Sequence, residues 1–178
     1  IDDDILKNVP RNDWIDTVKE VIKNKFRTGI PVGGRFIKVN KITRSEYTNS
    51  KNAKYLRKYE NTIYRDKFKS ANHLDDIVLS ATNFINEDLN HTRSDNITDF
   101  ARGDVLMRVG KNDYKAKVVV GFTSGKSMVL YDVVDIQPTS IKLKKATTYT
   151  GDTLNPNRKT VAPSTNNIPQ NSGNVNTN

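Results

Sequence analysis

The strongest constraint on the fold is a change in the spacing of apolar residues at Phe100. From there to Lys145 the chain reads FARGDVLMRVGKNDYKAKVVVGFTSGKSMVLYDVVDIQPTSIKLKK, with three to four β-branched runs separated by turn signals of two to five residues. The turn signals are GKND, TSGK and QPTS, at residues 110–113, 123–126 and 137–140. Short strands joined by tight turns form an antiparallel meander, which we therefore expect over about 100–143.

Before this point apolar residues recur at helical spacing instead. The first helix is expected to begin at a cap formed by Asn12 and to bury one face, made of Trp14, Val18, Val21, Ile22 and Phe26. A small hairpin or isolated strand is expected around 36–39, after Gly33 and Gly34. The sequence TRSE at 43–46 has the form of a capping box, and two or three helices are expected between there and residue 85.

Helices followed by strands predict an α+β fold, with N-terminal helices packed on a C-terminal antiparallel sheet of three to five strands. We expect a linker at 1–10 and a single domain at 11–145, with its helical half at about 11–85. The polar segment 86–99 separates this half from the meander. Residues 146–178 are rich in Asn, Thr and Pro, and we expect them to form a disordered tail.

Composition excludes several kinds of site. The 178 residues include no cysteine and only two histidines, so thiolate zinc sites, cysteine nucleophiles, disulfides and histidine-rich metal sites are excluded. We expect neither metal nor cofactor. The net charge of +9 suits a polyanion such as nucleic acid, although a well-solvated basic surface is the alternative. Because no apolar run approaches about 20 residues, we expect a soluble segment of a larger protein, with no membrane partner.

One stretch invites comparison with a phosphate-binding loop. Gly121, Gly125, Lys126 and Ser127 resemble the pattern G-x-x-x-x-G-K-[ST], but only three residues separate the two glycines. The residues that follow, SMVLYDVVDI, alternate like a strand, so no helix N-terminus would face a phosphate. The stretch therefore predicts a hairpin turn.

Alternation within the predicted strands places cationic and hydroxyl side chains together on the solvent side of the sheet. Cleavage of RNA by internal 2′-OH attack needs a base, a cation for the transition state and an acid, but no metal. The candidate catalytic residues are His91, Lys117, Thr123 and Tyr131, and the candidate phosphate-binding residues are Arg102, Arg108, Lys115 and Arg44.

In this hypothesis each group has a role. His91, in the loop before the meander, acts as base or acid, and Lys117 or Arg102 holds the phosphate. Thr123 donates a hydrogen bond to it, and Tyr131 stacks on a base or moves a proton. The alternative is that these residues are the ordinary polar side chains of a half-solvated sheet. The same applies to the tyrosines and phenylalanine of the helical half, which we assign to core or rim packing: Tyr55, Tyr59, Tyr64 and Phe68.

Three segments resemble a known family. DFARGDVLMRVG at 99–110, VVVGFTSG at 118–125 and YDVVDIQPTS at 131–140 are similar to the large polyvalent protein-associated domain of type three, found in large proteins of phages and mobile elements. The resemblance extends over most of residues 5–143. More loosely, helices followed by a meander resemble the barnase/EndoU/colicin/RelE class of metal-independent ribonucleases. Members of that class combine on the sheet the residue types found at His91, Arg102, Lys117, Thr123 and Tyr131.

These resemblances imply two functions. The first is a metal-independent RNase effector or toxin domain that cleaves RNA such as tRNA, is delivered into a bacterial cytoplasm and pairs with an acidic immunity protein. The second is a noncatalytic module that binds nucleic acid or protein within a larger phage or mobile-element protein. A nuclease should gather its catalytic residues around one phosphate-sized pocket, whereas a binding module can spread its cations over a surface. The sequence sets no expectation for the oligomeric state.

Overall fold

The first helix forms where the apolar spacing predicts it. In the computed structural model, which describes residues 4–88 and 96–143, the 3-10 turn η1 (Arg11–Asp13) leads into α1 (Trp14–Lys25). Val18 and Ile22 lie one turn apart on α1 and are buried. The predicted cap is wrong, because Asn12 lies within η1 and Asp13 occupies the N-cap position without a side-chain hydrogen bond.

The expected small hairpin consists of β1 (Ile30–Val32) and β2 (Arg35–Lys38). Gly33 and Gly34 form its turn with φ of 54° and 77°, in the left-handed region that glycine enters without steric penalty. Gly29, just before β1, has φ of 83°, and a Cβ there would lie 2.7 Å from the carbonyl oxygen of Ile37. Glycine is therefore required at position 29 both for its backbone conformation and for the close approach of β2.

Four further helices follow, rather than two or three. They are α2 (Lys41–Asn49), α3 (Lys51–Tyr59), α4 (Asn61–Lys69) and α5 (Leu74–Ser80), with the 3-10 turn η2 (Ser70–His73) between the last two. The reciprocal cap of α2 starts at Asn40, not at Thr43: Ile42 N–H donates to Asn40 Oδ1 over 2.9 Å, and Asn40 N–H donates to Thr43 Oγ1 over 3.1 Å. None of the helices in residues 4–88 and 96–143 is long and apolar enough to cross a membrane.

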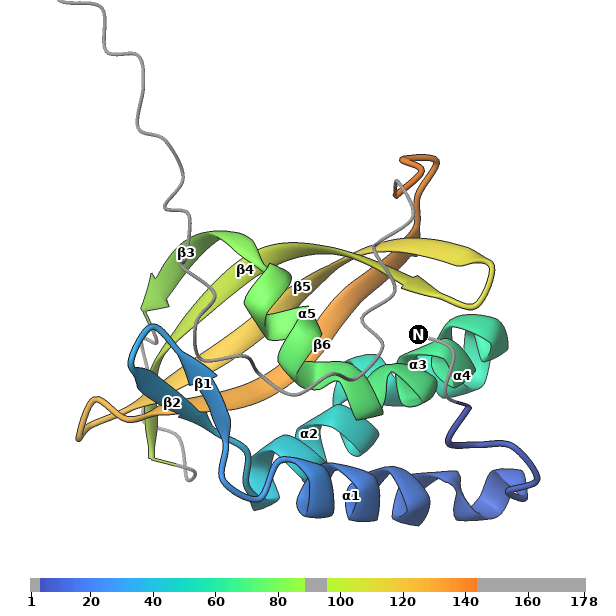
Figure 1. Cartoon of the computed structure of the whole chain (residues 1–178), viewed down its shortest axis with the longest axis horizontal. Coiled ribbons are helices and arrows are strands. Elements are labelled where there is room, and N and C mark those ends of the chain that lie inside the picture. Colours follow the sequence, from blue (N-terminus) through green and yellow to red (C-terminus); the bar gives the residue numbers. More distant parts are fainter. Residues whose placement is uncertain (1–3, 89–95, 144–178) are drawn as a thin grey trace, which may run out of the picture. The chain divides into compact units, whose positions relative to one another are not determined.

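The sheet confirms the α+β class. Its longer strands are β3 (Thr82–Asp88), β4 (Ile97–Val109), β5 (Asn112–Thr123) and β6 (Met128–Pro138). In the part of the chain that the structure describes, six strands pair in the order β1-β2-β6-β5-β4-β3 (Figure 1), and all pairs are antiparallel except β2 with β6. The sheet exceeds the expected three to five strands because the hairpin and β3 both join the meander.

The sequence did not predict β3. Phe84 and Ile85 continue the helical spacing of α5, but the helix ends at Ser80 and the chain pairs with β4 instead. The Phe84 ring packs over Gly103 of β4, where a Cβ would lie 2.6 Å from the ring. Of the segment 86–99 expected as a polar connection, residues 86–88 and 97–99 belong to β3 and β4, and residues 89–95 lie outside the described residues.

The β4–β5 hairpin shows the predicted alternation. The residues that face the helices are Val105, Met107, Val109, Tyr114, Ala116, Val118 and Val120. The β5–β6 register shifts between Val119 and Val120, and both Asp132 and Val133 of β6 lie on the helix side. Strict alternation along the strand would place Val133 on the same side as Tyr131, away from the helices, and the register shift prevents this.

The stretch compared with a phosphate loop is the turn between β5 and β6. Thr123 N–H donates to the Ser127 carbonyl over 3.0 Å, and Lys126 N–H donates to the Thr123 carbonyl over 2.8 Å. Lys126 has φ of 59°, and the chain continues directly into β6. This geometry confirms the hairpin, because Ser127 is followed by the strand β6 and not by a helix whose N-terminus could bind a phosphate.

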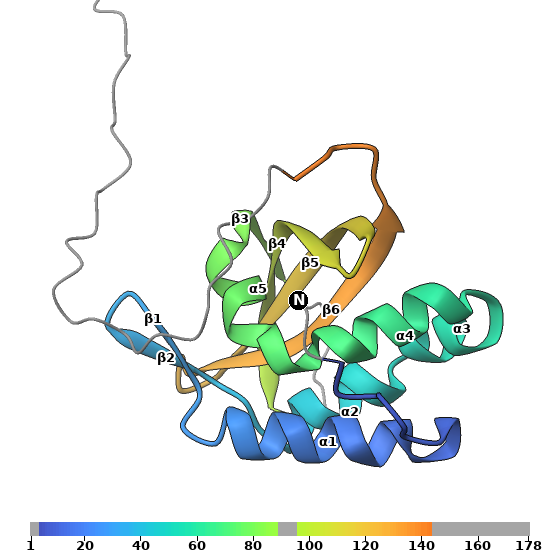
Figure 2. The same cartoon turned by 45° about the vertical axis from the view of Figure 1, so that its right-hand side comes forward.

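The helices pack on one face of the sheet and form the main core with it (Figures 1 and 2). Leu6, in the segment expected as a linker, is buried in this core, and Asp4 pairs with Lys69 over 2.8 Å. The opposite face, called here the outer face, carries a smaller apolar cluster, made of Ile97, Phe100, Val119, Val129 and Tyr131.

A buried ion pair connects the helix layer to β6. Lys67 Nζ lies 2.7 Å from Asp132 Oδ1, with side-chain exposures of 0% and 2%. Ser50 Oγ donates to Asp132 Oδ2 over 2.8 Å, and the ammonium lies 4.7 Å from the centre of the Tyr47 ring. Burial raises the pKa of Asp132, and the charge and hydrogen bond of Lys67 oppose that rise. Water does not reach the pair, so the cost of removing both charges from water is offset only by the contacts that the two side chains make in the protein.

A second buried carboxylate connects α4 to β5. Asp66 Oδ2 accepts a hydrogen bond from the Tyr114 hydroxyl over 2.6 Å and another from Asn112 Nδ2 over 2.8 Å. Burial, followed by the hydrogen bond to Asp66, raises the pKa of Tyr114. The phenol therefore stays protonated and serves as a donor.

Candidate nucleic-acid interface

Two of the predicted phosphate ligands on the outer face are held in ion pairs. Lys117 on β5 faces Asp104 on β4, with 2.6 Å between Nζ and Oδ1. Arg102 Nε lies 2.9 Å from Glu87 Oε2 on β3. The hydrogen bond and charge of Lys117 lower the pKa of Asp104, so this carboxylate is ionised at neutral pH. A phosphate at either cation would compete with a carboxylate already in place.

Arg108 is engaged more completely. Its Nε and Nη2 donate to the two carboxylate oxygens of Asp113 over 2.6 and 2.9 Å, and Nη2 also donates to the Leu143 carbonyl over 2.9 Å. The hydrogen bond from Arg108 lowers the pKa of Asp113. The guanidinium fork thus serves the end of the β4–β5 hairpin, and its role as a phosphate ligand stays a prediction.

The other two predicted phosphate ligands lie on different elements. Lys115 is exposed on β5 opposite Leu106, and it forms no ion pair within the described part of the chain. Arg44 lies in α2 and is half-buried. The structure therefore brings Lys115 close to Lys117, two residues away on the same strand face, but places Arg44 in the helix layer.

Tyr131 lies on the side of β6 that alternation predicts, but it is buried there. Only 8% of the residue is exposed, and its ring packs edge-on against Phe100 with 4.7 Å between the ring centres. The ring is part of the apolar cluster of the outer face. The expectation that Tyr131 faces solvent is therefore wrong, and its role in stacking on a base or moving a proton stays a prediction.

Thr123 ends β5, far from Lys117. Its hydroxyl oxygen accepts a hydrogen bond from Ser127 N–H over 3.2 Å and so fixes the turn. Thr123 lies six positions after Lys117 on the same strand, which corresponds to about 20 Å at the usual rise of a strand. His91, the proposed acid or base, lies outside the described residues. Thus Lys117 and Thr123 cannot contact the same phosphate in this structure.

A different surface gathers exposed cations with exposed rings. Helix α3 presents to solvent a set that we call the α3 surface, made of Lys51, Lys54, Tyr55, Lys58 and Tyr59. The two tyrosines are 54% and 59% exposed. None of the three lysines forms an ion pair with any residue in 4–88 or 96–143. The α3 surface therefore offers positive charge that no described carboxylate neutralises.

The position of α3 accounts for this exposure. Ala53 and Leu56 form its buried side, against α2 and α4, and Ser50 caps its N-terminus by accepting a hydrogen bond from Ala53 N–H over 3.1 Å. The helix lies at the end of the helix layer (Figure 2), and its other side is open. Of the four aromatic residues assigned to core or rim packing, Tyr64 and Phe68 lie in the core, whereas Tyr55 and Tyr59 do not.

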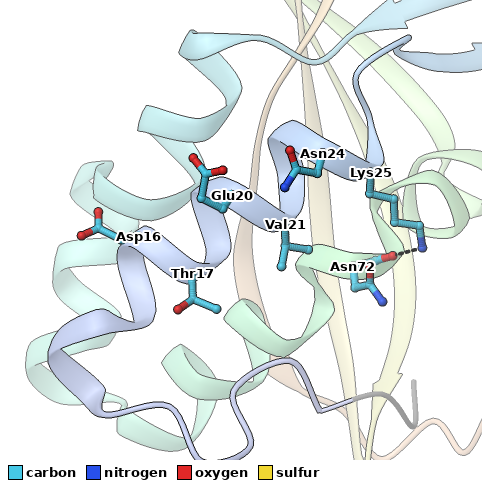
Figure 3. A pocket seen from close by; sticks show the side chains of 7 residues that line it. All are labelled: Asp16, Thr17, Glu20, Val21, Asn24, Lys25 and Asn72. Carbon is cyan, nitrogen blue, oxygen red and sulfur yellow. Dashed lines mark hydrogen bonds between the residues drawn. The ribbon is translucent and has the colours of Figure 1, made fainter.

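A depression along α1 is less suited to a polyanion. It measures about 830 Å³ and lies between α1 and η2 (Figure 3). Its lining includes the carboxylates of Asp16 and Glu20, and Lys25 Nζ is already hydrogen bonded to the backbone carbonyl of Asn72. The negative charge of the two carboxylates would repel phosphates, so we place the candidate interface on α3 rather than here.

Comparisons with known proteins add no relative to this picture. Searches with the chain against protein-family models, curated proteins and solved structures found no match in any of the three.

Proposed function

We propose that this chain is a noncatalytic nucleic-acid-binding module and that the α3 surface is its interface. The observation that carries the proposal is the concentration, on a helix of nine residues, of two exposed tyrosines and three lysines that pair with no carboxylate of the described residues. The net charge of +9 supports it, because a basic protein attracts polyanions over long range. The resemblance to domains of large phage and mobile-element proteins fits a binding role within a longer chain.

The proposal makes a quantitative statement about salt. Each lysine that neutralises a phosphate releases a counterion, and the slope of log Kobs against log salt changes by about −0.7 per contact with a single strand. If Lys51, Lys54 and Lys58 each contact one phosphate, they account for a slope of about −2. Replacing all three should reduce the slope by that amount and weaken binding to every sequence similarly.

Fluorescence anisotropy with labelled oligonucleotides at several salt concentrations tests this statement. The variant carries Lys51→Gln, Lys54→Gln and Lys58→Gln together, and the matched control carries Lys115→Gln and Lys117→Gln on the outer face. We expect weaker binding and a shallower salt slope for the α3 variant only. The proposal is wrong if the wild-type chain binds no nucleic acid, or if only the outer-face variant loses affinity.

The ribonuclease hypothesis is tested with the same protein. Purified wild-type chain is incubated with total RNA without added metal, beside His91→Ala and Lys117→Ala variants. The noncatalytic proposal predicts intact RNA in all three samples. Cleavage that both substitutions abolish would replace the proposal with the ribonuclease hypothesis, whereas equal cleavage in all three samples indicates a contaminating nuclease.

A further inference from the structure

The two tyrosines of the α3 surface form a single aromatic platform. Tyr55 and Tyr59 lie one helical turn apart, their ring centres are 5.0 Å apart, and the ring planes meet at 45°. The Lys58 ammonium lies 4.9 Å from the centre of the Tyr59 ring. Both tyrosines are more than half exposed. The platform thus combines two accessible rings with a cation beside them.

Packing of the fold does not explain this platform. The buried side of α3 is supplied by Ala53 and Leu56, and the pair Tyr64 and Phe68, at the same spacing on α4, shows what core aromatics look like here. Those two residues are 2% and 0% exposed. The open side of a helix needs no aromatic residue for packing, so two adjacent exposed rings there are available to a partner with a flat apolar face.

The order of the residues along α3 suits one class of partner. Lys51, Tyr55 and Lys58 are spaced by four and three residues, so they share one line on the helix surface. Lys54 and Tyr59 lie on the two sides of this line. Between Lys51 and Lys58 the helix rises about 10 Å. A cation therefore lies before and after the first ring, as the alternating phosphates and bases of a nucleic acid strand require.

We infer that the α3 surface binds single-stranded nucleic acid in preference to a duplex, with bases stacked on Tyr55 or Tyr59 and phosphates on the neighbouring lysines. This inference rests on the proposed function. In a duplex the faces of the bases are covered by their neighbours, whereas an unpaired strand exposes them for stacking on aromatic side chains. Stacking of this kind tolerates any base sequence, because every base has a flat face.

The test separates stacking from charge. Four labelled ligands of equal length are used: single-stranded RNA, single-stranded DNA, a DNA duplex and an abasic DNA strand that keeps the phosphates but lacks the bases. The protein is tested as wild type, with Tyr55→Leu and Tyr59→Leu together, and with Tyr55→Phe and Tyr59→Phe together. Leucine keeps an apolar helix-forming side chain without a ring, and phenylalanine keeps the ring.

We expect the leucine variant to bind both kinds of single strand about tenfold or more weakly, and to bind the duplex as the wild type does. The phenylalanine variant should keep its affinity within about twofold, since stacking needs the ring and not the hydroxyl. The abasic strand should bind the wild type about as weakly as the intact DNA strand binds the leucine variant.

Failure of this inference differs from failure of the proposed function. If the wild-type chain binds none of the four ligands, the proposed function is wrong. If it binds them but prefers the duplex, or if the leucine variant binds single strands unchanged, the inference alone is wrong. Should the leucine variant lose its thermal unfolding transition, the abasic strand and the phenylalanine variant still decide the question with folded protein.

Discussion

Removing one partner of the buried Lys67–Asp132 pair should destabilise the protein far more than removing both. In Lys67→Met the carboxylate of Asp132 stays in a site that is 2% exposed and loses its counterion. In Asp132→Asn the ammonium of Lys67 loses its counterion in the same way. Breaking a buried pair from one side typically costs about 3–5 kcal/mol, so each variant should lose stability of that order.

The magnitude follows from the geometry. At the 2.7 Å separation of Nζ and Oδ1, attraction between two unit charges amounts to about 6 kcal/mol at an effective dielectric constant of about 20. Desolvation of the two ions costs several kcal/mol each and offsets most of this attraction. The double variant, Lys67→Met with Asp132→Asn, removes both terms and keeps an oxygen that accepts from Ser50. We expect it within about 2 kcal/mol of the wild type.

Urea unfolding followed by tryptophan fluorescence measures these free energies, since Trp14 is half-buried and its Nε1–H donates to the Val9 carbonyl over 3.0 Å. The control is Lys23→Met, which breaks the exposed pair with Glu20 on α1 and should change stability by no more than about 0.5 kcal/mol. Single variants that each cost less than about 1 kcal/mol, or whose effects simply add in the double variant, would refute the reasoning.

The stability lost in Lys67→Met should depend on pH in a definite direction. Burial raises the pKa of Asp132, so the ionised carboxyl destabilises the fold; this group favours folding most at low pH, and its contribution is lost as the pH rises through the folded-state pKa. Without Lys67, which opposes that rise, the pKa of Asp132 should be higher still. The free energy lost in Lys67→Met should therefore shrink as the pH falls from 7 toward 5. A loss that stays constant over this range would contradict the account.

Three further substitutions test other parts of the fold. Gly29→Ala should destabilise the protein by at least about 1 kcal/mol more than Gly34→Ala in urea unfolding, because both positions have positive φ but only at position 29 would Cβ meet a backbone oxygen. Arg108→Gln should raise the pKa of Asp113 toward its ordinary value in an NMR titration. In the wild type, the ionised Asp113 contributes stability above its unfolded-state pKa, and this contribution is lost as the pH falls through the folded-state pKa. The variant should lack this contribution. Tyr114→Phe removes a donor from a buried carboxylate and should cost about 1–3 kcal/mol in the same unfolding assay, while equal stability would contradict the assigned hydrogen bond.

Local patterns were sufficient to predict the meander but not its extension. The β4–β5 alternation follows from residues that neighbour each other in the sequence, so it could be predicted. The strand β3 could not, because Phe84 and Ile85 fit a helical spacing and pair with β4 only through tertiary contacts. The irregular register of β6 near Asp132 could not be predicted from the sequence either, since a bulge inserts one residue without a sequence pattern of its own.

One of the two ion pairs that hold predicted phosphate ligands on the outer face could be predicted from the sequence. With a two-residue turn at Gly110 and Lys111, the register places Asp104 opposite Lys117, and so predicts their ion pair. Arg102 differs, because its partner Glu87 lies on the strand that the sequence did not predict. Residue types alone therefore suggested free cations where the folded chain pairs them.

For the α3 surface the signal was present in the helical spacing. Ala53 and Leu56 define one side of the helix, and Tyr55 and Tyr59 fall away from it at 100° per residue. Tyr55, Tyr59 and Tyr64 have nearly helical spacing, so they resemble the buried side of one helix. In the fold Tyr55 and Tyr59 lie on the open side of α3, and Tyr64 lies on the buried side of α4. The lysines of this helix also indicate an exposed surface, since several positive charges on one side of a helix are unusual in an element that packs in the core.

The parallel pairing of β2 with β6 has a consequence for synthesis on the ribosome. Ile37 pairs with Met128, about ninety residues later, so β6, the last strand within residues 4–88 and 96–143, lies in the middle of the sheet. Until residues 128–138 emerge, β2 and β5 both have an open edge, and Lys67 lacks its carboxylate. On the ribosome, the helices and the two partial sheets therefore precede the strand that joins them.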